Sequence, residues 1–111
     1  MLFRSQNLEA VSYATVAADR GKHIYHNSGV AHTYTINDAT VNYPVGATMT
    51  FVNGIGAGIL TIALQTTANN LVWSPSGGLG NRLIAAVGQA TAVKITAGTP
   101  GLWFISGLGI T

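Results

Sequence analysis

Short segments rich in Val, Ile, Thr and aromatic residues follow one another from Lys22 to the end of the chain, with turn signals between them. Such residues fit a pleated, half-buried sheet, and short strands spaced by roughly 8–12 residues are typical of a sandwich or barrel. In Ala31–Ile36 and Thr48–Asn53 apolar and polar residues alternate, which indicates one buried face and places Tyr34 and Phe51 in the core. The expected strands are Lys22–His26, Ala31–Ile36, Thr40–Tyr43, Thr48–Asn53, Gly58–Leu64, Asn70–Trp73, Arg82–Val87, Thr91–Ile95 and Leu102–Ser106.

The connections between these segments are too short for helices. A parallel sheet needs crossover connections of about a dozen or more residues, usually helical, so the pattern favours antiparallel pairing. We therefore expect an all-β fold, an antiparallel β-sandwich or barrel that is jelly-roll-like. Residues 1–20 lack the rhythm of strands and turns, and we expect an N-terminal arm there, either helical or extended, followed by one β-sandwich domain over residues 21–111.

Charged residues are scarce in this chain. Five Lys or Arg and three Asp or Glu make up 7% of 111 residues, whereas a soluble domain carries about 25%. So few charges do little to keep copies of a protein apart, so we expect a homo-oligomer, a dimer, whose surface is largely covered by partners. A hydrophobic share of 48% excludes a disordered chain.

Membranes and nucleic acids are not expected partners. The apolar runs fall short of the ~20 residues of a membrane span, and Arg4 and Glu9 interrupt any signal-peptide core. The basic residues are scattered singly, although the net charge is +2 and the pI about 9.3. Nucleic-acid binding requires a clustered basic patch that neutralises several phosphates.

The residues able to do chemistry form no complete motif. Cysteine is absent, and no side-chain carboxylate occurs from Ala39 to Thr111. A paired-carboxylate hydrolase could draw only on Glu9, Asp19 and Asp38, of which the first two lie in the arm, so this chemistry is not expected. His23 and His26 point to opposite faces of a strand, and only His26 and His32 could meet, across a hairpin. A metal site would normally recruit a further carboxylate or thiolate.

Two other patterns resemble sites only superficially. Ser28, His26 and Asp38 can be arranged as a catalytic triad on paper, but no nucleophile motif supports it, and Asp38 is interpreted as a turn residue. Gly54–Gly58 opens another strand rather than a helix, so it is interpreted as a turn, and the glycine-rich segment 76–80 lacks the Lys-Ser/Thr ending of a phosphate-binding loop. We expect no enzymatic activity, no metal and no cofactor.

Apolar and aromatic side chains remain as candidates for contacts with other molecules. Trp103 and Phe104 are adjacent, so one of them faces outward on a strand, and large aromatic residues dominate interface energetics. The candidate interface residues are Leu2, Phe3, Leu8, Val11 and Tyr13 in the arm, together with Trp73 and Trp103. The two tryptophans also keep open a small carbohydrate-binding sandwich.

Three stretches resemble a β module of tailed-phage virion proteins. They are residues 19–26 with 31–36, residues 43–53 with 56–58, and the ending 91–95 with 101–111, which together cover about two fifths of the chain. A free-standing chain of this length is most similar to the small capsid decoration, or staple, proteins of epsilon15-like short-tailed phages. The resemblance implies a jelly-roll-like homo-oligomer that is made in the host cytoplasm, sits on the outer face of the capsid and bridges major capsid protein subunits. A tail fibre, tail appendage or receptor-binding module is the alternative.

Overall fold

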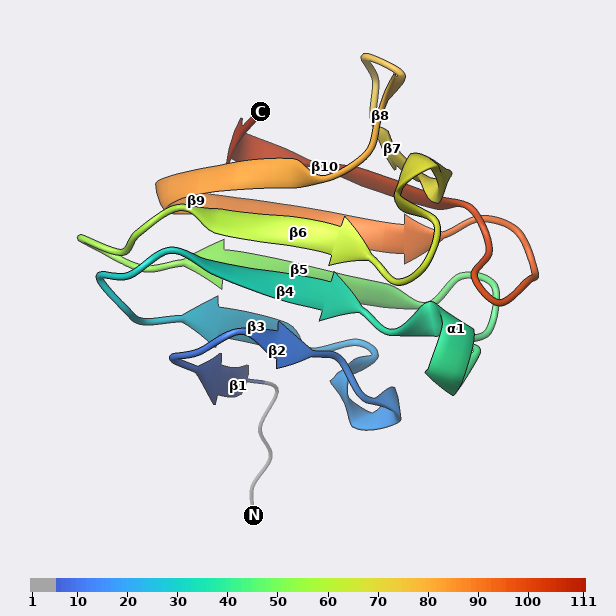
Figure 1. Ribbon diagram of the computed structural model, residues 1–111, viewed down its shortest axis with the longest axis horizontal. Helices are drawn as coiled ribbons and strands as arrows, with labels where there is room; N and C mark the ends of the chain where they lie inside the picture. Colours follow the sequence, from blue (N-terminus) through green and yellow to red (C-terminus); the bar gives the residue numbers. More distant parts are fainter. Residues whose placement is uncertain (1–5) are drawn as a thin grey trace.

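The computed structural model describes residues 6–111 as strands stacked in two packed layers, with the described N-terminal residues and the C-terminus at opposite ends of the stack (Figure 1). The all-β sandwich is confirmed. Its strands are β1 (Gln6–Glu9), β2 (Tyr13–Ala14), β3 (His23–His26), β4 (His32–Ile36), β5 (Thr48–Asn53), β6 (Leu60–Leu64), β7 (Leu71–Trp73), β8 (Gly78–Leu79), β9 (Arg82–Lys94) and β10 (Trp103–Ile110). Short helical turns are η1 (Ala17–Asp19), α1 (Asp38–Val41) and η2 (Ala68–Asn70).

The first six strands coil, because the chain changes layer after every strand. Strands β1, β3 and β5 pair in parallel in one layer, while β2, β4 and β6 pair in parallel in the other. The expectation of purely antiparallel pairing is therefore wrong for this half of the chain, and also for β7, which pairs in parallel with β10. Each crossover that a parallel pair needs is supplied by a strand of the opposite layer instead of a helix.

Strand β9 closes the sandwich by serving both layers. Its start pairs antiparallel with β6 through Arg82–Ile84, and after a bend its residues 89–93 pair antiparallel with β5. Strand β10 then follows β9, and β7 and β8 complete the sheet. We call β1-β3-β5-β9-β10-β7-β8 the wide layer and β2-β4-β6 with the start of β9 the narrow layer.

The core lies between the layers and is built from the alternating inward residues. Tyr34 of the narrow layer meets Phe51 of the wide layer, with ring centroids 6.4 Å apart, and both are fully buried as the alternation predicts. The other large, fully buried apolar side chains are Ile24, Ile36, Met49, Leu60, Ile62, Leu71, Ile84, Trp103 and Ile105. A continuous core of this size accounts for folding without disulfides.

The N-terminal arm is not confirmed for the residues that the structure describes. Residues 6–9 pair with β3, residues 13–14 pair with β4, and Thr15 and Asp19 are buried. Strands therefore begin at Gln6 rather than at Lys22. A segment with weak alternation becomes part of the sheet because neighbouring strands offer it an open edge to pair with.

Two of the expected strand assignments differ from the structure: the segment expected as the strand Thr40–Tyr43 overlaps a helix, and two other expected strands form one continuous strand. Residues 38–41 form α1, since the buried Asp38 side chain accepts from the Tyr43 backbone N–H and holds this turn closed at 2.9 Å. Arg82–Val87 and Thr91–Ile95 merge into β9, which continues through the bend between them. The short strands β1, β2 and β8 were not expected.

Candidate docking surface

The candidate interface residues do not lie together in the structure. Leu8 and Val11 are exposed by 55% and 60%, so they remain available for contacts. Trp103 is fully buried and cannot be a surface anchor, whereas its neighbour Phe104 faces outward. Leu2 and Phe3 lie outside the described residues.

Tyr13 and Trp73 are engaged within the chain. The Tyr13 hydroxyl donates to Asp19, and its ring packs edge-on against Tyr34 with centroids 6.0 Å apart. Trp73 is half-buried against the core, and the Arg82 guanidinium lies 5.1 Å from its ring centroid. Neither tryptophan offers the open aromatic platform on which a sugar ring stacks, so the carbohydrate-binding interpretation loses its main support.

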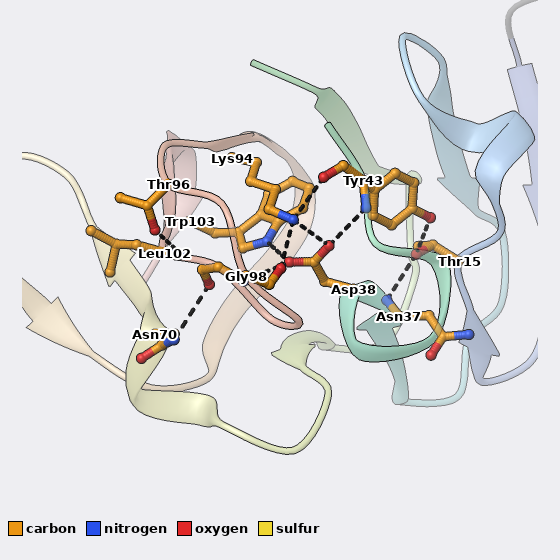
Figure 2. A network of polar contacts seen from close by, with 11 residues as sticks. Thr15, Asn37, Asp38, Tyr43, Asn70, Lys94, Thr96, Gly98, Leu102 and Trp103 are labelled. Atoms are coloured by element: carbon orange, nitrogen blue, oxygen red, sulfur yellow. Dashed lines mark hydrogen bonds and ion pairs between the residues drawn. The ribbon is translucent and has the colours of Figure 1, made fainter. Parts of the chain in front are cut away.

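The most highly connected polar group is a buried ion pair between residues far apart in sequence (Figure 2). The Lys94 ammonium lies 2.9 Å from Asp38 Oδ1 and also donates to the carbonyls of Tyr43 and Gly98. Asp38 Oδ2 accepts from the Gly101 N–H and from Trp103 Nε1. This network joins α1, the end of β9 and the start of β10, so Asp38 is more than a turn residue.

Every oxygen and ammonium proton of this pair has a partner, which is the condition under which a buried ion pair is tolerated. Burial by itself opposes ionisation of Asp38, but hydrogen bonds from Trp103, Gly101, Lys94 and Tyr43 outweigh it and hold the pKa of the carboxyl below its usual value. Asp38 is therefore a carboxylate that is closed to solvent and fully engaged, and it serves to clamp three elements.

A second buried carboxylate anchors the N-terminal strands. Asp19 Oδ1 accepts from the Asn7 amide, and Asp19 Oδ2 accepts from the Tyr13 hydroxyl and the Val16 N–H. Burial and the hydrogen bond to Asp19 raise the pKa of Tyr13, because the phenol must keep its proton to donate. The network ties β1, β2 and η1 together at one end of the stack.

The two histidines that could meet do meet. His26 Nε2 lies 2.9 Å from His32 Nδ1, and His26 Nδ1 lies 2.6 Å from Asn53 Oδ1. The Asn53 amide donates to the carbonyls of Gly58 and Ile84, so its oxygen must accept from His26. Both nitrogens of buried His26 are thus used, and within residues 6–111 no group of three potential ligands gathers for a metal ion.

These networks leave the surface with very few charges. Asp19, Asp38 and Lys94 are buried, so among the described residues only Glu9, Arg20, Lys22 and Arg82 are left to charge the surface of this 5248 Å² molecule. The fold lowers the surface charge further, because three of the seven charged side chains among the described residues are buried inside the molecule. Monomeric proteins rarely present such a surface to water.

The loops that connect the strands on one side of the molecule carry the exposed aliphatic side chains. We call this side the loop end; it comprises residues 10–12, 27–31, 54–59, the β9 bend at 85–88 and residues 107–111, on the left in Figure 1. Each segment presents at least one aliphatic side chain that is more than half exposed, and the five most exposed are Val11, Val30, Ile55, Val87 and Leu108. None of these segments contains a charged or aromatic side chain.

The loop end is held together by close backbone contacts. The Val87 N–H donates to the Gly54 carbonyl, and the Gly58 N–H donates to the Ser28 carbonyl. A Cβ at Gly58 would lie 2.6 Å from the backbone of Val30, and a Cβ at Gly107 would collide with the Gln89 carbonyl. Only glycine allows the backbones of neighbouring loops to come this close. The exposed aliphatic side chains therefore project from loops that are held in place by contacts with one another.

Val87 stands in a strained conformation at this end. Its φ of 64° lies in the left-handed region, which a β-branched residue rarely enters and which costs about 1–2 kcal/mol. The side chain is 71% exposed, so burial within the chain does not offset this cost. Asn or Gly would be the residue expected there on grounds of stability alone.

Comparison with known proteins adds no relative: no family model, no curated protein and no solved structure matches this chain. Within residues 6–111, no helix has the length and apolar character needed to cross a bilayer. The surface itself is thus the source of functional evidence. Sequence reasoning found its scarcity of charge but missed the loop end, whose only local signal is the glycine content of its turns.

Proposed function

We propose that this chain is a structural virion protein that binds the outer surface of a phage capsid and cements neighbouring major capsid protein subunits. The observation that carries the proposal is the nearly uncharged surface, which suits a subunit covered by partners better than a free solute. The resemblance of its strand segments to decoration proteins points to the same role. The proposed location is the exterior of the virion, after synthesis in the host cytoplasm.

The proposed role is structural rather than catalytic. Two of the three carboxylates are almost fully buried and engaged with internal donors, and His26 is enclosed by Asn53 and His32. Among residues 6–111 the cations that reach the surface are Arg20, Lys22 and Arg82, which are too few to neutralise a run of phosphates.

The loop end is the proposed shell contact. Burial of an exposed Val, Ile or Leu contributes roughly 1.5–3 kcal/mol, whereas association costs about 4–15 kcal/mol, so a few such side chains make one weak site. A repetitive shell offers many such sites. When copies of this chain are linked and one copy is bound, the next copy is held at a high effective concentration near its own site and binds more readily. The partner surface is apolar and uncharged protein, because a lipid surface favours cations and Trp or Tyr, which the loop end lacks.

A matched pair of substitutions tests this contact. Val87→Asn relieves the strained conformation and removes an apolar side chain, so the free protein should become more stable by about 1 kcal/mol while its binding to shells weakens. Val45→Asn is the control, because Val45 is 58% exposed in the loop before β5, away from the loop end.

The measurement is co-sedimentation with bare shells of the major capsid protein encoded in the same genome. We expect the chain and the Val45→Asn variant to bind alike and Val87→Asn to bind at least ten-fold more weakly. Failure of the unmodified chain to bind shells would overturn the capsid role. Negative-stain images separate the alternative, since a tail appendage gives density at the tail and a cement protein gives a lattice over the shell.

A further inference from the structure

Among the described residues, the outward face of the wide layer is a registered array of side chains that carry no charge. Inward residues such as Ile24, Phe51 and Ala90 are buried, so the alternate residues of β1, β3, β5, β9 and β10 point to solvent. Strand register aligns them in rows: Gln6, His23, Thr50, Thr91 and Ser106 in one, and Leu8, Tyr25, Val52, Gln89 and Leu108 in the next. Thr48, Val93, Phe104 and Val72 form a third row.

This face is also shaped. A depression of about 430 Å³ lies between Lys22 and Gln89 and is floored by Thr48, Thr50 and Val52. Phe104 stands out on the same face, on the far side of β9 from β5, with 36% of its surface exposed. A hollow and a projecting ring on one face are what a self-complementary surface needs, because both partners in a two-fold interface use the same patch.

Area decides which face can hold a second copy. The broad faces span 37 × 35 Å and the ends about 35 × 21 Å. Taken as ellipses, they offer about 1000 and about 600 Å², and a stable interface takes roughly 800 Å² from each partner. The broad faces therefore offer the most room, and of the two the wide layer has more strands and more apolar residues than the narrow layer, whose outward positions are mainly Thr and Ala.

We propose that the outward face of the wide layer is a two-fold interface with a second copy of this chain. Around a two-fold axis each residue approaches its own counterpart, so a face that carries net charge repels itself. The thirteen outward positions on β1, β3, β5, β9 and β10 carry no Lys, Arg, Asp or Glu, with Lys22 at the rim only. Pairing this face covers Leu108 and leaves the other four most exposed side chains of the loop end free at the side of the dimer.

The test introduces one charge at the centre of each broad face. Thr91→Lys lies on β9, the central strand of the wide layer, beside Thr50, to which the Thr91 hydroxyl is hydrogen-bonded at 2.9 Å. Thr61→Lys is the matched control, because Thr61 lies on β6 and points outward from the narrow layer. Gln89→Glu adds charge to the wide layer with little change of shape and guards against misfolding of the lysine variant.

Sedimentation equilibrium of the purified chain, without shells, measures the result at about 1–100 µM. We expect the unmodified chain and Thr61→Lys to be dimers, and Thr91→Lys and Gln89→Glu to dissociate with dissociation constants raised at least 100-fold. A monomeric unmodified chain, a dimeric Gln89→Glu or a monomeric Thr61→Lys would overturn the proposal. The outcome is independent of the capsid role, since no shell enters the experiment, and shell binding can fail while the dimer persists.

Discussion

Replacement of Asp38 by asparagine should be the most damaging isosteric change in this protein. Asp38 Oδ1 accepts from the Lys94 ammonium and the Tyr43 N–H, and Oδ2 accepts from the Gly101 N–H and Trp103 Nε1. An amide has one oxygen and one NH2 group. Whichever way the introduced amide is turned, its NH2 group therefore faces two donors, and the Lys94 charge loses its counter-ion.

The magnitude follows from these contacts. Removing one partner of a buried ion pair costs about 3–5 kcal/mol, and the donor conflict places Asp38→Asn at the upper end, near 5 kcal/mol. Lys94→Met should cost about 3 kcal/mol, because the carboxylate keeps three donors and the methionine fills the space. The double variant should lose about 2 kcal/mol less than the sum, since no unpaired buried charge is left.

Urea unfolding followed by tryptophan fluorescence measures all three variants, because Trp103 is itself a member of the network. The slope of the free energy against urea should stay unchanged, so midpoints report stability directly. A loss below about 1 kcal/mol for Asp38→Asn, or a larger loss for Lys94→Met than for Asp38→Asn, would refute the account of this network.

Three further outcomes are expected. The lowered pKa of Asp38 means that its contribution is present above the usual value of 3.8 and is lost as the pH falls through the folded value, so urea midpoints should drop below about pH 4. Burial raises the pKa of Tyr13 and Tyr34 above the usual 10.0, so their contribution is present below about pH 10 and is lost above it, which absorbance at 295 nm and alkaline urea midpoints check. Deletion of residues 6–16 removes β1 and β2 and should lower the melting temperature, measured by circular dichroism, by more than about 10 °C. An unchanged melting temperature would mean that these residues form an arm on which the fold does not depend.

Local pattern was enough to place much of the β structure. Thr48–Asn53 alternates so cleanly that its strand and its buried Phe51 follow from period two alone. The same reasoning fails at Lys94, which stands between Val93 and Ile95 and therefore points to solvent by pattern. In the structure Lys94 is 1% exposed while Ile95 is 40% exposed, because a partner 56 residues away neutralises the lysine inside.

The sequence by itself determined the all-β class, most of the breaks between strands and the scarcity of charged residues. Periodicity and turn residues act over a few neighbours, so this information is local. Only the tertiary structure decided that the first six strands coil in parallel, that Asp38 and Lys94 meet inside, and that exposed aliphatic side chains gather at one end. These features depend on which segments, far apart in sequence, pack against one another. The alternation within a strand shows which of its faces is buried but not which segment lies opposite that face.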